Sequence, residues 1–451
     1  MANIAVAKFG GTSVATHQAM SRCAAIIKAK STRTLVVVSA PAGVTNHLVS
    51  LSQPGLDLQE QSETIQAIRT IVFNIIDDLS QRDAAEQIGD QVENILADLT
   101  VRAASQSLQF DAQNADSILA CGEQMSSLVF AQVLNELDVP AQSFDVRRVM
   151  KTNSLYSKAV VDIEQVAQLT QSILAPLLDN QVVVTQGFIG QDGLGNTTTL
   201  GRGGSDYSAA ILAEALVAEN LEIWTDVEGI FTTDPRITAQ AKSIPEISFG
   251  EAAEMATFGA KILHPATLIP AMRKNIPVFV GSSKAPEKGG TRIQQSVESS
   301  PTYRSIALRR EQSLVTVRSP EMLHASGFLA KVFSILAKHE LSVDLITTSE
   351  ISVAMTFDNP TSNAQALITH EVVKELEQLC EVSVEHGLSL VAVIGNGLHA
   401  AKALGSSIFE KINDFNIRLI CHGASANNIC FLVPESDANS VVSQLHNTLF
   451  D

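Results

Sequence analysis

Between residues 1 and 46 the apolar and polar positions follow an order typical of a parallel sheet with helical crossovers. An apolar strand begins at Ile4 and ends in a Gly-Gly turn, and residues 15–30 place apolar side chains at helical spacing. The β-branched run 34–40 has almost no polar alternation, as in strands that are buried on both faces. The pattern predicts a βαβ unit, whose ligands would bind where the parallel strands end.

The same pattern continues along the next part of the chain. Residues 56–110 are helical in character and rich in Gln, Asp and Ala, which predicts a helical excursion that serves as a lid or an interface. A second buried strand is expected at 181–189, a helix at 206–217 and a strand with polar groups at its end at 221–226. The run 277–281 is expected to be the last strand of this α/β region.

A polar, proline-containing stretch, Glu298-Ser-Ser-Pro-Thr302, follows this region and has no apolar periodicity. Such a stretch is typical of a linker. We therefore expect a first domain at residues 1–295 and a second domain at residues 296–451.

The second domain contains a repeat. Leu314-Val-Thr-Val317 recurs 76 positions later as Leu390-Val-Ala-Val393, and each copy follows the order strand, loop, helix, strand, strand. Together with an apolar-periodic helix near 441–449, this order predicts two ferredoxin-like modules, at about 310–385 and 386–451. The alternative is a chance similarity between two βα units.

Composition and charge narrow the function classes. Hydrophobic residues make up 45% and charged residues 18% of the 451 positions, which excludes a disordered or collagen-like chain. The net charge of −17 opposes binding to nucleic acid or to an anionic membrane. No window is expected to approach a membrane span, the N-terminus lacks the features of a secretion signal, and the 5 scattered cysteines are typical of reduced thiols. We expect a soluble, cytoplasmic protein.

Two glycine-rich segments carry candidate chemistry. Lys8-Phe-Gly-Gly-Thr-Ser13 ends the first strand, so that backbone N–H groups and the Lys8 charge could approach a phosphate, although a plain turn is the alternative. It is not the Walker pattern. Leu200-Gly-Arg-Gly-Gly-Ser-Asp206 leads into a helix, where Arg202 could hold a carboxylate or phosphate. Helix capping alone is the alternative interpretation of Ser205 and Asp206.

Further polar residues are expected at strand ends or in unusual surroundings. Lys261 stands in an otherwise apolar run, whereas the nearby His264 precedes a proline and is typical of a turn. The other candidates are Ser39, Thr45, Thr225, Asp226 and Arg236. Glycine loops combined with these cations suit phosphoryl transfer. A carboxylate acceptor would explain why no catalytic histidine is evident, since it is already ionised near pH 7.

At this point the motifs resemble those of a known family. Lys8-Phe-Gly-Gly-Thr-Ser13, Thr198-Thr-Leu-Gly-Arg-Gly-Gly-Ser-Asp206, Trp224-Thr-Asp226, Thr232-Thr-Asp-Pro-Arg236 and Phe258-Gly-Ala-Lys-Ile-Leu-His-Pro265 resemble aspartate kinases, and the repeat resembles their paired ACT domains. Phe328-Leu329 and Ser342-Val-Asp-Leu-Ile-Thr-Thr-Ser-Glu350 look most like the lysine-sensitive, monofunctional type.

The resemblance implies an α/β amino-acid-kinase sandwich of the carbamate-kinase type followed by two ferredoxin-like ACT modules. It also implies that MgATP phosphorylates L-aspartate to 4-phospho-L-aspartate, the first step toward lysine, threonine and methionine. Mg²⁺ would be bound mainly through the nucleotide phosphates, with no metal site on the protein. The molecule would be a homodimer through its ACT domains, or a tetramer.

The resemblance assigns roles residue by residue. Lys8, Arg202 and Asp206 would be catalytic, with Lys8 stabilising the transferring phosphoryl group and Asp206 orienting the phosphate-facing cations. Glu123, which by itself reads as a solvated helix residue, would hold the substrate α-amino group. The other aspartate contacts would be Ser39, Thr45, Arg202 and Ser205, and the ATP contacts would be Lys8, Gly10, Gly11, Thr225, Asp226, Phe231, Arg236 and Lys261.

The resemblance also implies an allosteric lysine site in the first repeat. Its residues would be Met322, Phe328, Leu329, Ser342, Val343, Asp344, Thr348, Ser349 and Glu350. Two positions depart from the family. Phe231 replaces a tyrosine, which removes a hydroxyl contact to the nucleotide, and Ala325 replaces a serine, which predicts weaker sensitivity to lysine.

Two alternatives remain open from the sequence. One is a kinase of another amino acid, and Glu123 speaks against an N-acylated substrate because a carboxylate partner suits a free α-amino group. The other is a catalytically silent ACT-type amino-acid sensor. The presence of Lys8, Arg202, Asp206 and Lys261 argues against that alternative.

Overall fold

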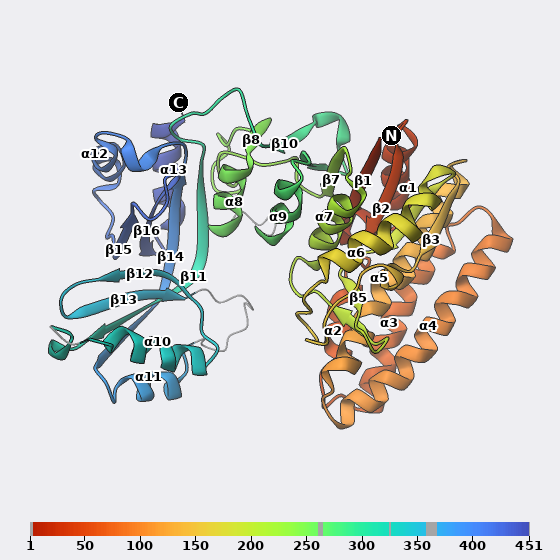
Figure 1. The fold of residues 1–451 in the computed structure, drawn as a ribbon, viewed down its shortest axis with the longest axis horizontal. Helices are drawn as coiled ribbons and strands as arrows, with labels where there is room; N and C mark the ends of the chain where they lie inside the picture. Colours follow the sequence, from red (N-terminus) through yellow and green to blue (C-terminus); the bar gives the residue numbers. More distant parts are fainter. Residues whose placement is uncertain (1–2, 260–264, 324–325, 358–367, 451) are drawn as a thin grey trace. The chain divides into compact units, whose positions relative to one another are not determined.

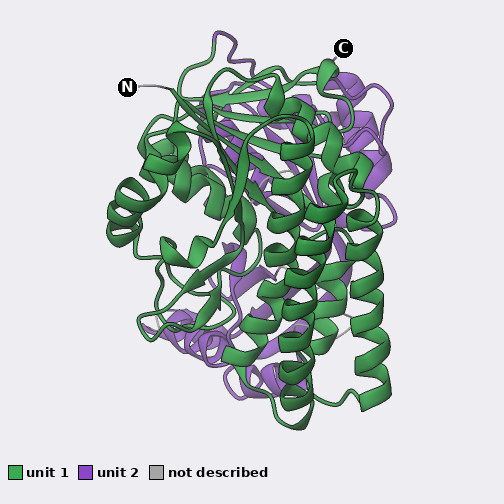
Figure 2. Ribbon diagram, turned by 90° about the vertical axis from the view of Figure 1, so that its right-hand side faces the viewer, with its two compact units in different colours: residues 1–230, 243–249, 261–297 green, residues 231–242, 250–260, 298–451 purple. Residues whose placement is uncertain are grey.

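A computed structural model of the chain describes residues 3–259, 265–323, 326–357 and 368–450. The chain divides into two compact units (Figure 2). Unit 1 contains residues 1–230, 243–249 and 261–297, and unit 2 contains residues 231–242, 250–260 and 298–451. Each unit is described by itself.

Unit 1 is built on an eight-stranded sheet in the order β3-β4-β2-β1-β7-β9-β10-β8 (Figure 1). The strands from β3 to β9 are parallel to their neighbours, whereas β10 is antiparallel to β9. Their bounds are β1 Ile4–Phe9, β2 Arg33–Val38, β3 Ala141–Phe144, β4 Val182–Gln186, β7 Asn220–Thr225, β8 Glu246–Ser248, β9 Val278–Ser282 and β10 Gly290–Gln294. The continuous burial of β1 and β2 after their first residues confirms the prediction of strands buried on both faces.

Helices surround this sheet and extend well beyond it (Figure 1). Their bounds are α1 His17–Lys28, α2 Val44–Leu51, α3 Leu58–Ile76, α4 Arg82–Leu108, α5 Ala112–Glu136, α6 Ile163–Leu169, α7 Gly204–Leu216 and α9 Pro265–Arg273. The predicted excursion at 56–110 is the pair α3 and α4. A capping box of Asp57 and Glu60 starts α3, and the pair joins the core through buried apolar residues such as Val72 and Leu99. A small hairpin, β5 Ile189–Gln191 with β6 Thr197–Thr199, completes the unit.

The helix α5 is the segment that bears on the expectation that no window approaches a membrane span. Within the described residues this helix alone is long and apolar enough to cross a membrane, but 78% of its apolar window is buried inside the protein. It packs against α1, α2, α3 and α4 as well as against β3 and β4. Its hydropathy therefore reflects the position of a core helix, which carries Glu123.

Unit 2 contains a six-stranded antiparallel sheet in the order β12-β13-β11-β14-β16-β15. Its strands are β11 Ser305–Arg318, β12 Val343–Thr348, β13 Ser352–Phe357, β14 Glu381–Ile394, β15 Leu419–His422 and β16 Asn428–Pro434. Its helices are α8 Phe249–Thr257, α10 Phe328–Lys338, α11 His370–Leu376, α12 Leu404–Phe409 and α13 Ala438–Leu449, with Phe249 itself assigned to unit 1. Each element of the first copy begins 76 positions before its counterpart in the second copy, which confirms the predicted repeat. The pairs are β11 and β14, α10 and α12, β12 and β15, and β13 and β16.

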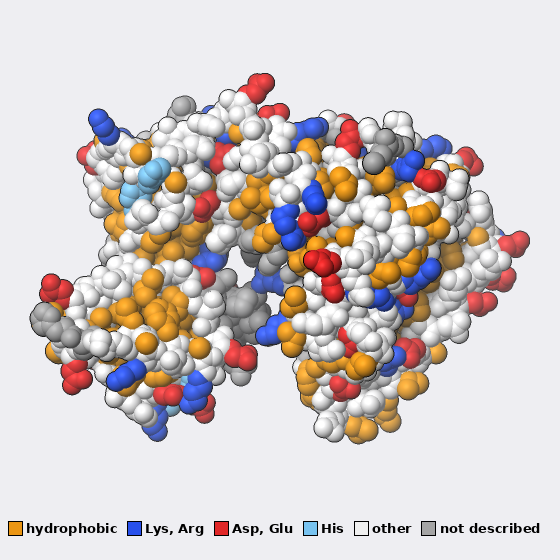
Figure 3. Space-filling view, viewed as in Figure 1, with side chains coloured by type: hydrophobic (Ala, Val, Ile, Leu, Met, Phe, Trp, Pro, Cys, Tyr) orange, Lys and Arg blue, Asp and Glu red, His pale blue; other side chains and the backbone are white. Residues whose placement is uncertain are grey.

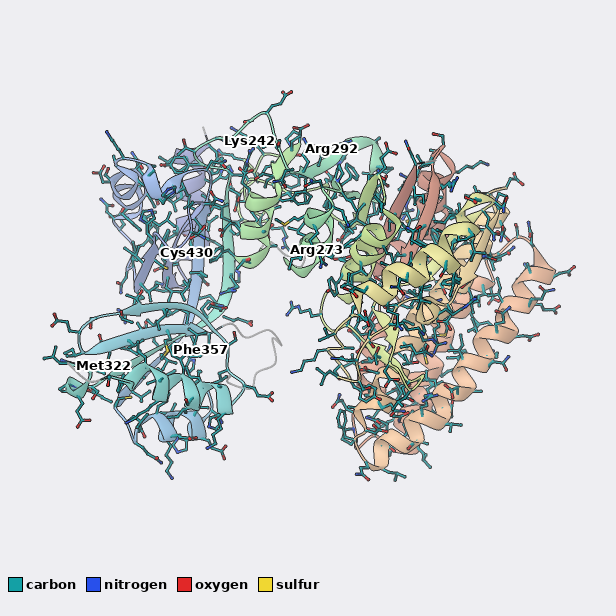
Figure 4. All side chains as sticks on the ribbon, viewed as in Figure 1. Lys242, Arg273, Arg292, Met322, Phe357 and Cys430 are labelled. Atoms are coloured by element: carbon teal, nitrogen blue, oxygen red, sulfur yellow. The ribbon has the colours of Figure 1, made fainter. Side chains whose placement is uncertain are left out.

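The two modules of the repeat share their longest strands. The second half of β11 pairs with the first half of β14, and the first half of β11 pairs with the second half of β14, with register shifts in between. The core of the first module therefore contains Val315 from β11 together with Val382 from β14. The core of the second contains Ile306 from β11 and Val393 from β14. Figure 4 shows Met322 and Phe357 in the first module and Cys430 in the second.

Two earlier segments of the chain belong to unit 2. In segment 231–242, Thr232 Oγ1 lies 2.8 Å from Nε2 of the buried His446 in α13. In segment 250–260, the fully buried Glu251 accepts a hydrogen bond of 2.7 Å from Arg304 Nε and another of 2.6 Å from the Asn396 amide. Removing one partner of a buried ion pair costs about 3–5 kcal/mol, so that Glu251 anchors α8 firmly within unit 2.

Candidate active site

The strands β1, β2 and β7 lie side by side and end at the same edge of the sheet, where polar residues gather. The backbone N–H of Gly10 donates to the Trp224 carbonyl at 3.1 Å, and the N–H of Ser39 donates to the Phe9 carbonyl at 3.2 Å. These bonds join the loop after β1 to the end of β7, and the loop after β2 to the end of β1. The carboxyl edge of a parallel sheet is where ligands bind in such folds, and the candidate residues collect there.

The Gly-Gly turn after β1 is packed closely against the loop after β2. A Cβ at Gly11 would lie 2.8 Å from the Ala40 carbonyl oxygen, so that only glycine fits there. In this structure the N–H of Gly10 is bonded to the Trp224 carbonyl. A Cβ at Gly10 would stand 3.7 Å from Lys8 Nζ, which is an ordinary contact distance.

Lys8 and Asp206 form an ion pair at this edge. Lys8 is 8% exposed near the end of β1, and its Nζ lies 2.5 Å from Asp206 Oδ1. Asp206 belongs to the first turn of α7, and its side chain is 17% exposed. A largely buried pair of this kind holds the ammonium group in one place.

Glu123 lies on α5 and its carboxyl reaches the same edge of the sheet. It is 6% exposed, and burial raises the pKa of its carboxyl from the ordinary 4.5 to about 7, against the lowering effects of the Ala40 N–H and the Lys8 charge. The interpretation as a solvated helix residue is therefore wrong. A buried carboxyl with a raised pKa near a lysine in a strand-end cluster is typical of a functional position.

The loop that carries Arg202 connects β6 to α7. Gly203 has φ +72° and is the N-cap of α7, with no side-chain cap. The alternative that Ser205 or Asp206 caps this helix is therefore wrong, and both side chains lie in the first helical turn. Because the N-terminus of a helix favours anions, the exposed Arg202 and the first turn of α7 together suit a carboxylate.

The remaining aspartate candidates lie in the loops of the same edge. Ser39 is half-buried directly after β2, and Thr45 is exposed in the first turn of α2. Ser205 is half-buried in α7, next to Asp206. Unit 1 thus contains every residue that the sequence suggested for the amino-acid substrate.

The nucleotide candidates are divided between the two units. Thr225 ends β7 and its hydroxyl donates to Asp226 at 3.2 Å, both in unit 1. Phe231 is half-buried in unit 2, where Arg236 is exposed and forms a bidentate pair with Asp234. Lys261 and His264 lie outside the described residues.

The candidate lysine site lies in the first module of unit 2. Met322 and Phe328 pack against the module's apolar core, whereas Leu329 on α10 is 38% exposed. The edge strand β12 contains Asp344, whose Oδ2 is 2.7 Å from Arg309 Nη2. Of the other candidates, Val343 is half-buried, and Ser342, Thr348, Ser349 and Glu350 are exposed. Ala325 lies outside the described residues.

Sequence reasoning missed two contacts that shape this edge. The Ser13 and Ser283 hydroxyls lie 2.6 Å apart and join the loops after β1 and β9. Asp116, on α5, is fully buried and accepts hydrogen bonds from two loops. The neighbouring sequence predicts neither contact, because an isolated serine or a helical aspartate is most often exposed to solvent.

Comparison with known proteins agrees with this architecture. The amino acid kinase family model matches residues 3–282, and an ACT domain model matches residues 391–449. The chain therefore belongs to the amino acid kinase family. Lysine-sensitive aspartokinase 3 of Escherichia coli is 52% identical over the whole of both chains, and the aspartokinase of Chlamydia pneumoniae is 32% identical over 98% of this chain and 97% of its own. Within the family, the chain belongs to the aspartokinases.

Solved structures extend this likeness to the fold. E. coli aspartokinase III in complex with aspartate and ADP, described as the R-state, matches 99% of this chain and 100% of its own with a TM-score of 0.91. The same enzyme in complex with lysine and aspartate, described as the T-state, matches with a TM-score of 0.85. Both are 52% identical to this chain.

Proposed function

We propose that this protein transfers the γ-phosphoryl group of ATP to the side-chain carboxylate of L-aspartate, giving ADP and 4-phospho-L-aspartate, and that L-lysine inhibits it. The observation that carries the proposal is the Lys8–Asp206 pair beside the buried Glu123 at the end of β1. A cation for the phosphoryl group and an anion for an α-amino group are the two charges that this reaction needs close together.

The chemical step needs little from the protein beyond position and charge. The attacking carboxylate is ionised at neutral pH, so that no general base is required. Negative charge is spread over the phosphoryl oxygens during transfer, and a fixed ammonium group stabilises it. Lys8 supplies this group, and Asp206 holds it in position.

Aspartate is bound through both of its α-substituents. Glu123 receives the ammonium group, and Arg202 holds the α-carboxylate in a bidentate manner near the first turn of α7. Ser39, Thr45 and Ser205 complete the substrate contacts. A substrate whose α-amino group is acylated would leave the buried Glu123 without a partner, which favours a free amino acid.

For the nucleotide, the proposal keeps the contacts that the family resemblance implies. They are Lys8, Gly10, Gly11, Thr225, Asp226, Phe231, Arg236 and Lys261. Among the described residues, no group of three or more His, Cys, Asp or Glu side chains could hold a metal ion. In this proposal Mg²⁺ arrives with the phosphates of ATP, where it neutralises part of their charge.

The proposal includes the domain boundaries that the sequence predicts. Residues 1–295 form the catalytic domain and residues 296–451 the regulatory domain, with ACT modules at about 310–385 and 386–451. The protein is cytoplasmic and forms a homodimer through its ACT modules. Exposed apolar side chains on the first module support this pairing, among them Leu329, Phe333 and Ile346. Figure 3 shows apolar side chains gathered on this module.

The catalytic half is tested by trapping the acyl phosphate with hydroxylamine. Purified protein with MgATP and L-aspartate is expected to form aspartyl hydroxamate, and added L-lysine is expected to lower the rate. Product from another amino acid but not from aspartate would replace the substrate assignment. No product from any amino acid, with lysine still bound, would favour the sensor instead.

Lysine binding is tested at Asp344. Asp344→Ala is expected to raise the lysine concentration for half-inhibition at least about tenfold, because the effector loses a charge-assisted partner. The rate without lysine is expected to stay within about twofold. Glu385→Ala is the matched control, since Glu385 also pairs with an arginine, Arg418, but outside the candidate lysine residues. An unchanged inhibition curve in Asp344→Ala would contradict the assignment.

A further inference from the structure

Asp116 is a fully buried carboxylate that has no part in the proposed chemistry. It lies on α5, seven residues before Glu123, which is about two helical turns or about 10 Å along the axis. Seven residues bring two side chains to nearly the same face of a helix. The helix therefore holds Asp116 and Glu123 at a fixed spacing.

Both oxygens of Asp116 are used to hold two loops. The Ser157 N–H donates to each oxygen at 3.0 Å, the Thr199 N–H donates to Oδ2 at 2.7 Å, and the Thr199 hydroxyl donates to Oδ1 at 2.8 Å. These are charge-assisted bonds to a fully buried side chain, and such bonds are about twice as strong as neutral ones. Burial raises the pKa of Asp116, and the hydrogen bonds from Ser157 and Thr199 oppose that rise.

The two segments that Asp116 holds, at Ser157 and at Thr199, both adjoin the loop that carries Arg202. Thr199 is the last residue of β6, three positions before Arg202. The backbone of Ser157 packs on the same loop, because a Cβ at Gly201 would lie 3.1 Å from the Ser157 carbonyl oxygen. The N–H of Ala159 donates to the Thr199 carbonyl at 2.9 Å and closes the arrangement.

We propose that Asp116 is a positioning residue that sets the distance between Arg202 and Glu123, and thereby the fit of the α-carboxylate and α-ammonium groups of the amino-acid substrate. The proposal rests on the aspartate-binding role assigned above to Arg202 and Glu123. In this way α5 fixes the positions of the two residues that bind the substituents of the substrate's α-carbon, its carboxylate and its ammonium group. Asp116 does not touch the substrate or the nucleotide.

The test is a comparison of KM values in the full-length enzyme. Asp116→Asn keeps the size of the side chain but turns one acceptor into a donor that faces backbone N–H groups. We expect the KM for aspartate to rise at least about tenfold, the KM for ATP to stay within about twofold, and kcat to fall less than the aspartate KM rises. Asp192→Asn is the matched control, because the buried Asp192 accepts N–H bonds from Leu194 and Asn196 at the other end of the same hairpin.

A graded pair of variants keeps the test valid if Asp116→Asn fails to fold. Thr199→Val removes one hydroxyl bond and is expected to raise the aspartate KM by a smaller factor, whereas Thr199→Ser retains the hydroxyl and is expected to restore it. Equal changes in both KM values, or the same aspartate effect in Asp192→Asn, would overturn the positioning role. Wild-type protein that makes no aspartyl hydroxamate would instead overturn the proposed function.

Discussion

Replacing Lys8 by methionine will lower kcat for acyl phosphate formation by about a hundredfold to a thousandfold, the loss typical for removal of one fixed donor to a charged transition state. Methionine fills a similar volume, so that the end of β1 stays packed while the charge is lost. The Asp206 carboxylate, left without its partner, also repels the phosphates. Steady-state rates with saturating ATP and aspartate measure the effect.

Lys30→Met is the matched control for this prediction. Lys30 also pairs with a carboxylate, Glu222, in unit 1, but it lies away from the candidate residues. We expect a loss of stability in this control and a kcat within about twofold of wild type. A Lys8 variant with near-normal kcat would show that the phosphoryl group is stabilised elsewhere.

Replacing Glu123 by glutamine will raise the KM for aspartate about a hundredfold and remove a pH dependence. Because the pKa of Glu123 is raised to about 7, the wild-type carboxyl becomes protonated below that pH and cannot pair with the substrate ammonium group. The wild-type kcat/KM for aspartate is therefore expected to fall tenfold per pH unit below about pH 7. Glutamine cannot titrate, and its profile should be flat there.

Thermal unfolding separates this effect from damage to the fold. A carboxyl whose pKa rises on folding stabilises the native state below its ordinary pKa, and that contribution is lost as the pH rises to about 7. The loss amounts to about 3 kcal/mol at 1.36 kcal/mol per pKa unit. Glu123→Gln should thus be more stable than wild type at pH 8, while Glu222→Gln, a buried control, should not. A variant that is both less stable and inactive would contradict this account.

The parts of the fold that could be predicted from the sequence are those with long, regular apolar patterns. The strands β1 and β2 could be predicted because they are largely apolar runs of 6 residues, and the helices α1 and α7 because they are 12 and 13 residues long. The strands β5, β6 and β8 have 3 residues each, too few to show a period. The pairing of distant strands such as β11 and β14 could not be predicted either, because a repeat shows which segments are equivalent but not which of them pair.

The residues of the candidate site also differ in how readily the sequence identifies them. Lys8, Arg202 and Asp206 stand in glycine-rich segments, which mark them in the sequence. Glu123 needed the family resemblance, since its burial depends on the loop after β2 folding onto α5. Asp116 could not be recognised, because its partners are groups of Ser157 and Thr199, which are 41 and 83 positions further along the chain.

The sharing of β11 and β14 between the regulatory modules sets how this part of the protein can be inherited. A recombination breakpoint between Glu385 and His386 would leave residues 381–385 of β14 with the first module, but it would separate the second module from residues 305–309 of β11, which pair with residues 390–394 of β14. A transplant of residues 386–451 alone would therefore carry an incomplete sheet. An engineer who moves the second module must bring residues 305–309 with it, so that the segment to be inherited together is not continuous in the chain.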